Sequence, residues 1–138
     1  MTERDRRIDA LLWALALAAV GLTVWFSFGL KPPGAEAFPQ ADKVEHAGAY
    51  FVTTLLLLLA AVWRPGRGPG LFWRWRWSVL VVMIVAGGAV ELAQQTLTEH
   101  RKGDVLDWAA EIVAVLAAVG VLAWLRGRRG VARQPDDT

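Results

Sequence analysis

Residues 42–63 read DKVEHAGAYFVTTLLLLLAAVW, so that nine residues rich in ionisable groups lead directly into an almost entirely apolar run. No polar side chain interrupts residues 55–61, whereas a helix on the surface of a soluble protein carries a polar stripe along its length. At about 1.5 Å of rise per residue, the segment 44–63 is long enough to cross a hydrocarbon core of about 30 Å. The stretch therefore predicts a membrane-spanning helix whose first turns are polar.

Three further segments of similar length and composition occur in the 138-residue chain, at 10–30, 77–97 and 105–125. With 55% hydrophobic and 20% charged residues, the chain is predicted to be an all-α, polytopic membrane protein with four transmembrane helices in a compact bundle. The alternative for the first segment is a cleaved signal peptide, but such a peptide has an apolar core of only about 7–15 residues. The lack of cysteine excludes disulfides, thiolate metal sites and cysteine nucleophiles.

The basic residues are divided unevenly between the two sides that four spans define. Eleven of the 15 lysines and arginines fall in the N-terminus, the middle connection or the C-terminal tail. The positive-inside rule then places both termini in the cytoplasm, residues 1–9 as a short N-terminal segment and residues 126–138 as a disordered basic tail. The predicted location is the cytoplasmic (inner) membrane. Because topology accounts for the arginines, nucleic acid is not an expected partner.

The acidic residues show the opposite bias. Eight of the 13 acidic residues and both histidines lie at or near the outer ends of the spans. Helical spacing places the polar groups of three spans on one face each. These groups are Asp42, Lys43, His46 and Tyr50 on the second span, Glu91 and Gln94 on the third, and Asp104, Asp107 and Glu111 on the fourth.

A carboxylate inside the membrane costs about 2.5–3.5 kcal/mol on insertion scales unless it faces protein or water. The polar groups are therefore expected to converge on an outward-facing pocket, with Arg101 as an additional cation. Counting residues from the outer span ends predicts two tiers in this pocket. Tyr50, Glu91 and Glu111 would lie about 9 Å deep, and His46, Gln94 and Asp107 would lie about 3–5 Å deep.

A purely structural role is the alternative, since interhelical hydrogen bonds in membranes contribute about 0.6 kcal/mol each on average. Three spans contribute here, all at one end, and they combine acid, base, imidazole, amide and phenol. That mixture favours a functional pocket. Close helix packing is predicted at two small-residue stripes, the alanines at 10, 14 and 18 and those at 110, 114 and 118.

Three blocks of the sequence, DKVEHAGAY (42–50), ELAQ (91–94) and HRKGDVLDWAAE (100–111), resemble the VanZ-like family of small bacterial membrane proteins. That family pairs a D-K-x-x-H-x-x-x-Y block with an E-x-x-Q block and an R-x-x-[SD]-x-x-D-x-x-x-N-x-x-G block. The resemblance covers about residues 42–114 and departs at two positions, where Glu111 replaces the family's Asn and Ala114 its Gly. It implies a four-span cell-envelope protein, linked to glycopeptide-antibiotic resistance through the member that names the family.

The predicted function is binding of a lipid headgroup or a lipid-linked cell-wall precursor, with Lys43 and Arg101 gripping its phosphate or carboxylate. One alternative is a membrane-embedded enzyme acting on a lipid-linked substrate, with His46 as general base and Glu91 and Asp107 as further catalytic candidates. A proton-coupled transporter or flippase, which would require a homo-oligomer, and a structural accessory subunit are the others.

The chain contains no recognised catalytic or metal-binding motif, so no metal is predicted for the site and no cofactor is named. Only the enzyme alternative would use a divalent ion. His46, Glu91 and Asp107 would then hold it, because imidazole and carboxylate ligands suit several metals.

Overall fold

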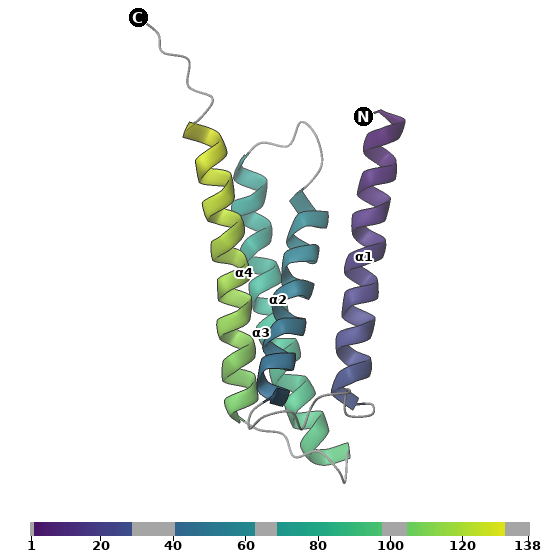
Figure 1. Ribbon diagram of the computed structural model, residues 1–138, viewed down its shortest axis with the longest axis vertical. Coiled ribbons are helices and arrows are strands. Elements are labelled where there is room, and N and C mark those ends of the chain that lie inside the picture. The colour runs from purple at the N-terminus through teal and green to yellow at the C-terminus, as the bar shows by residue number, and fades with distance from the viewer. Residues whose placement is uncertain (1, 29–40, 63–68, 98–104, 132–138) are drawn as a thin grey trace, which may run out of the picture.

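The computed structural model describes residues 2–28, 41–62, 69–97 and 105–131. Within these ranges the chain forms four α-helices and no β-strand: α1 (Glu3–Phe28), α2 (Ala41–Val62), α3 (Pro69–Leu97) and α4 (Val105–Val131). Each helix is long and apolar enough to cross a membrane, which confirms the predicted all-α architecture with four candidate spans. The helices run alternately up and down, so both termini lie at one end of the bundle, here called the terminal end (Figure 1). The distal end is the opposite one, where α2 and α4 begin.

The α1 helix starts at a capping box formed by Thr2 and Asp5. The backbone N–H and the hydroxyl of Thr2 both donate to Asp5 Oδ2 at 2.8 Å, and the Asp5 N–H donates back to Thr2 Oγ1 at 3.2 Å. Such reciprocal bonds satisfy backbone donors that have no partner within the first turn of a helix. The α3 helix starts at Pro69, a residue suited to a first turn because it has no N–H to leave unbonded.

The α4 helix extends further than the sequence predicted. It continues to Val131, so the prediction of a disordered tail over 126–138 is wrong for residues 126–131, while residues 132–138 lie outside the described ranges. Two contacts favour the longer helix. The Arg128 guanidinium lies 4.5 Å from the centre of the Trp124 ring, and Arg126 Nη2 donates to the Val62 carbonyl at 3.4 Å. That carbonyl belongs to the last turn of α2, where carbonyl groups have no N–H partner within the helix.

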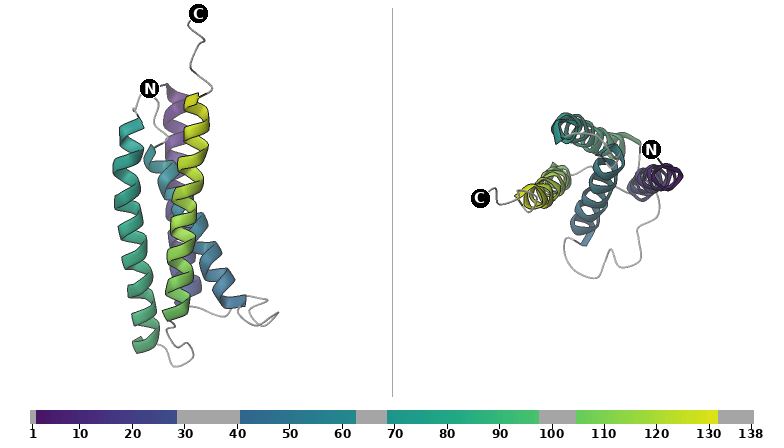
Figure 2. Two further views of the ribbon diagram at one scale, coloured as in Figure 1. Left: turned by 90° about the vertical axis from the view of Figure 1, so that its left-hand side faces the viewer. Right: turned by 90° about the horizontal axis from the view of Figure 1, so that it is seen from above.

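The α2 helix occupies the middle of the bundle. It lies between α1 and α4, with α3 alongside, and its contacts with α4 are the most extensive between any two helices (Figure 2). Among the described residues α1 contacts α2 and, to a smaller extent, α3, but not α4. Two clusters of buried apolar side chains form the core: Leu58, Ala61, Val62 and Leu122 toward the terminal end, and Tyr50, Met83, Ala114 and Val115 toward the distal end.

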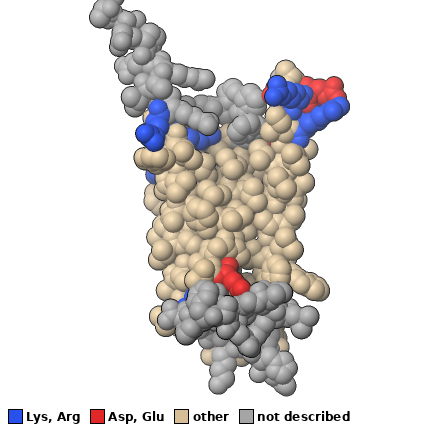
Figure 3. Space-filling view, viewed as in Figure 1, with Lys and Arg blue, Asp and Glu red and all other residues tan. Residues whose placement is uncertain are grey.

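The outside of the bundle is apolar between two charged ends. Large hydrophobic side chains are exposed on every helix; Leu17, Val85 and Val113, for example, are each 64–66% exposed. Figure 3 shows the resulting uncharged band, with basic and acidic side chains at its upper edge and an acidic side chain at its lower edge. Exposing so continuous an apolar surface to water would be unfavourable for a soluble monomer, whereas lipid tails would cover it. The surface thus fits a multi-pass membrane protein.

The small-residue stripes have different outcomes on the two helices. On α4, Ala114 and Ala118 are buried as predicted. On α1 the prediction is wrong, because the alanines at 10, 14 and 18 are exposed and the buried residues are Ala16 and Ser27. The inward face of α1 also carries Thr23, whose hydroxyl donates to Ala19 O, so that Thr53 Oγ1 on α2 is the donor in the 2.9 Å bond between the two threonines.

Enlarging Ala16 tests this orientation of α1. We expect Ala16→Leu to lower the free energy of unfolding by about 1–3 kcal/mol, because a larger side chain must be forced into a packed contact. The control Ala18→Leu lies on the exposed face and should change it by less than about 0.5 kcal/mol. Unfolding in mixed micelles of rising SDS content, followed by circular dichroism, measures both. Equal losses for the two variants would contradict the orientation of α1 described here.

Candidate functional site

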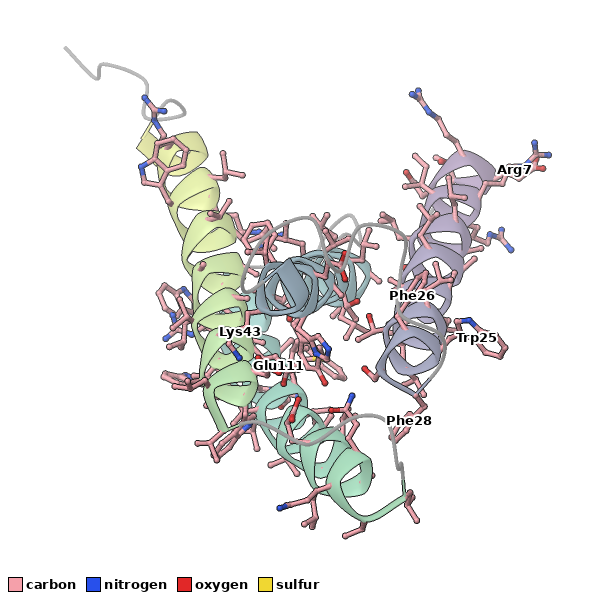
Figure 4. All side chains as sticks on the ribbon, turned by 60° about the horizontal axis from the view of Figure 1, so that its bottom comes forward. Arg7, Trp25, Phe26, Phe28, Lys43 and Glu111 are labelled. Carbon is pink, nitrogen blue, oxygen red and sulfur yellow. The ribbon has the colours of Figure 1, made fainter. Side chains whose placement is uncertain are left out.

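Two ionic contacts join α2 to α4 at the distal end. Lys43 Nζ donates to Asp107 Oδ1 at 2.5 Å, and the two side chains are 22% and 11% exposed. One turn further along α2, His46 Nδ1 lies 3.1 Å from Glu111 Oε1, a distance at which the ring N–H donates to the carboxylate. Figure 4 shows Lys43 and Glu111 together between α2 and α4, on the side of α2 that faces away from α1.

The α3 helix adds a second buried carboxylate beside the His46–Glu111 pair. Glu91 is 8% exposed and Glu111 only 1% exposed. One potential ligand atom from each of His46, Glu91 and Glu111 lies within 4.8 Å of the other two. Three helices therefore bring an imidazole and two carboxylates to one point, which we call the His–Glu–Glu cluster.

A glycine on α3 makes room for this cluster. A Cβ atom at Gly87 would overlap Glu111 Oε2 and would lie 3.3 Å from both Tyr50 Cε1 and Trp108 Cδ1. At the neighbouring Gly88 a Cβ would meet the Trp108 ring at 3.4 Å. The indole also donates from Nε1 to the Ile84 carbonyl at 3.0 Å. The Gly87-Gly88 pair thus allows α4 to approach α3 closely enough to bury Glu111 between the helices.

A cleft of about 320 Å³ opens between α1 and α2 and reaches the cluster from the other side of α2. Phe26 of α1 points toward this side of α2, whereas Trp25 points away from the bundle (Figure 4). His46 and Tyr50 belong both to the cleft and to the region of the cluster. Among the described residues, the lining consists of Thr23, Phe26, Ser27, Glu45, His46, Gly48, Ala49 and Tyr50.

Gln94 has a different surrounding from the one predicted. Its side chain is 3% exposed, and its Nε2 donates to the Ser27 carbonyl of α1 at 2.6 Å. Since α1 ends at Phe28, that carbonyl is among the last four that lack an intrahelical donor. Gln94 therefore contributes to holding the end of α1 against α3, where the cleft begins.

Of the residues predicted to form the pocket, the structure brings His46, Glu91 and Glu111 together and pairs Lys43 with Asp107. Asp107 was expected to join His46 and Glu91; it binds Lys43 instead, and Glu111 takes its place beside the histidine. His46, predicted in the shallower tier, thus contacts a residue predicted in the deeper one. Asp42 lies in the first turn of α2 with its side chain outside the described part, and Arg101 and Asp104 also lie outside it.

Negative groups outnumber positive ones among the described residues of the site. Four carboxylates, those of Glu45, Glu91, Asp107 and Glu111, lie in or beside it. Lys43 is the lysine among the described residues of the site, and its ammonium group already binds Asp107. An imidazole carries at most one positive charge. The site as described therefore attracts cations and hydrogen-bond donors more strongly than anions.

Sequence analysis missed the contribution of α1 and of Trp108. Thr23, Phe26 and Ser27 line the cleft, but nothing in a uniformly apolar span marks one face as the lining of a site. Trp108 could have been noticed, because a tryptophan within a span needs an acceptor for its N–H. Two consecutive glycines on the preceding span were the other available sign of a close approach.

Fold and site together define a class, the four-span helical membrane protein with a buried ionisable cluster toward one end of the bundle. Comparisons with protein-family models, curated proteins and solved structures find no match to this chain. The arrangement of the chain's own residues is therefore the basis on which any function must be proposed.

The close approach at Gly87 can be tested by adding a single methyl group. We expect Gly87→Ala to lower the free energy of unfolding by about 1–3 kcal/mol, because the methyl group displaces Glu111 or separates α3 from α4. Gly120→Ala on α4 is the matched control, since a Cβ there meets no atom within 4 Å. Alanine's higher helix propensity raises the free energy of unfolding of both variants alike, by about 0.8–1 kcal/mol. If both variants unfold at the same SDS fraction, the contact between Gly87 and Glu111 is refuted.

Proposed function

We propose that this chain is a VanZ-like cell-envelope protein that binds the polar headgroup of a membrane lipid or of a lipid-linked cell-wall precursor. The observation that carries the proposal is the cleft between α1 and α2, in which His46, Tyr50 and Glu45 of α2 lie opposite Thr23, Phe26 and Ser27 of α1. Concave sites with apolar walls and a few convergent polar groups are the usual form of ligand pockets. A link to glycopeptide-type antibiotic resistance rests on the family resemblance alone.

Charge distribution supports an outward-facing site in the cytoplasmic membrane. Arginines gather at the terminal end, at positions 4, 6 and 7 of α1, 74 and 76 of α3, and 126 and 128 of α4. At the distal end, the basic side chain among the described residues is that of Lys43. The positive-inside rule then puts the terminal end in the cytoplasm and the distal end outside. Arg76 lies 3.4 Å from the centre of the Trp73 ring, in keeping with an aromatic belt at the inner surface.

The kind of headgroup follows from the balance of charge in the site. Lys43 was expected to grip a phosphate, but Asp107 already holds its ammonium group. Carboxylates and a phenol are better suited to accept hydrogen bonds from sugar hydroxyls or amino groups. We therefore propose that the cleft recognises the hydroxyl- or amine-bearing part of the headgroup, with the lipid chain lying along the apolar side of α1.

A membrane-embedded enzyme is the second candidate, and the His46–Glu111 contact favours it. A carboxylate that orients an imidazole is the arrangement by which histidine acts as a general base. Glu111 would position the ring, and His46 would take a proton from a hydroxyl group or water in the cleft. The two candidates differ in one outcome: a binding protein returns its lipid unchanged, whereas an enzyme returns a product.

Orientation can be measured directly, because the chain has no native cysteine. We expect Glu3→Cys, at the terminal end, to react with a membrane-impermeant maleimide only after cells are opened. Thr96→Cys, near the distal end of α3 and exposed, should react in intact cells. The physical reason is the excess of arginine that remains on the cytoplasmic side. The reverse pattern of labelling would place the cleft at the inner surface and overturn the proposed function.

Ligand binding can be tested by filling the cleft without disturbing the cluster. Gly48 lines the cleft, and a Cβ there meets no atom within 4 Å, so Gly48→Leu should occupy the space without a clash. We expect it to reduce copurifying lipid at least tenfold, with no loss of thermal stability. Gly21→Leu on α1 is the control, because its Cβ also meets no atom within 4 Å and it does not line the cleft.

Native mass spectrometry of protein from membranes measures the bound lipid. Its mass distinguishes a phospholipid from a polyprenyl-linked sugar, and recovery of a modified lipid would support the enzyme instead. Unchanged lipid retention by Gly48→Leu would refute binding in the cleft.

A further inference from the structure

We propose that His46, Glu91 and Glu111 bind a divalent first-row metal ion, with Zn²⁺ as the simplest candidate. The three residues come from α2, α3 and α4, and one potential ligand atom from each lies within 4.8 Å of the others. Zinc–ligand bonds of about 2.0–2.2 Å hold neighbouring ligand atoms about 3.4 Å apart in a tetrahedron. Side-chain movements of about 1 Å would therefore bring the three atoms into coordination.

One oxygen of Glu111 gives independent support. Oε1 contacts His46, but Oε2 is buried and has no hydrogen-bond partner among the described residues. Glu111 is 1% exposed, so water from outside does not reach it readily. Buried carboxylates in proteins are paired, hydrogen-bonded or bound to a metal. Because Gly87 has no Cβ, no side chain at position 87 fills the space next to Oε2.

The electrostatics of the cluster favour a doubly charged cation. Two ionised carboxylates this close repel each other strongly in a medium of low polarity. A protonated His46 would offset one of the two negative charges, and Lys43 is held by Asp107. A divalent ion would offset both. The competing arrangement is a single proton shared between Glu91 and Glu111, which would need no metal.

The donor set also indicates the class of metal. Imidazole together with carboxylate suits Zn²⁺, Mn²⁺ and Fe²⁺, whereas Ca²⁺ and Mg²⁺ prefer shells made of oxygen alone. Three protein ligands leave a fourth position open in catalytic and ligand-binding zinc sites. Since His46 also lines the cleft, a ligand in the cleft could reach that position.

The ion would change which lipids the cleft accepts, a consequence that rests on the proposed function. Without metal, the carboxylates disfavour an anionic headgroup. With a divalent ion in place, a phosphate could bind to it directly. Lipids with a phosphate near the membrane surface should then bind more tightly with Zn²⁺ than after chelation, while neutral glycolipids should show no such gain.

The test uses the purified full-length protein in nanodiscs, stripped with a chelator and then titrated with Zn²⁺ alone. We expect one ion per chain by calorimetry and elemental analysis, and a rise in the thermal unfolding midpoint. Glu111→Gln should weaken binding by at least about tenfold and abolish the rise. Glu3→Gln, the same change at an exposed site at the terminal end, should bind as the wild type does.

A Co²⁺ spectrum of the wild-type protein provides a readout that does not depend on how well the variant folds. Bands typical of mixed nitrogen and oxygen ligation support the site. Failure of the wild type to bind Zn²⁺, or equal binding by Glu111→Gln and the wild type, overturns it in favour of the shared proton. Zinc binding without lipid retention would leave the metal site standing and refute only the lipid-binding function.

Discussion

Hydrocarbon accepts a carboxylate only where protein or water surrounds it, and in this chain that constraint bears most heavily on Glu111. Its side chain is buried, and α4 is apolar for several turns after it. Two features of neighbouring helices accommodate it: His46 on α2 supplies a hydrogen-bond donor to Oε1, and Gly87 on α3 supplies space beside Oε2. Because each faces the carboxylate, this contact constrains the rotation of α2, α3 and α4 about their own axes.

The remaining polar contacts of the distal end are arranged around the Glu111 side chain. Lys43 and Asp107 join α2 and α4 nearer the end of the helices, and Gln94 ties α3 to the last turn of α1. At the terminal end the contacts are of another kind. Arginines stack on tryptophans there or reach a backbone carbonyl of a helix end, as Arg126 does at Val62. The two ends thus differ in chemistry: cation–π and helix-end contacts at the terminal end, and buried ionisable groups at the distal end.

The spans and the inward faces of α2, α3 and α4 could be predicted from sequence because both depend on local patterns. Apolar length identifies a span, and polar residues at helical spacing identify its inward face. The partners could not be predicted as well. Asp107 and Glu111 lie one turn apart on the same face of α4, and a shift of one turn along the helix would exchange their roles. For α1 the difficulty was greater, since a uniformly apolar helix does not show which of its small residues face the bundle.

Because α1, in the described part of the chain, packs mainly on α2 and does not contact α4, the outer wall of the cleft and the ionisable cluster belong to different helices. The helices α2, α3 and α4 enclose the ionisable residues without the help of α1, and α1 forms only the outer wall of the cleft. Substitutions on that wall, at Thr23 or Phe26, can therefore change the shape of the cleft and leave the ionisable cluster unchanged. Selection could diversify one helix in such an architecture and preserve the other three.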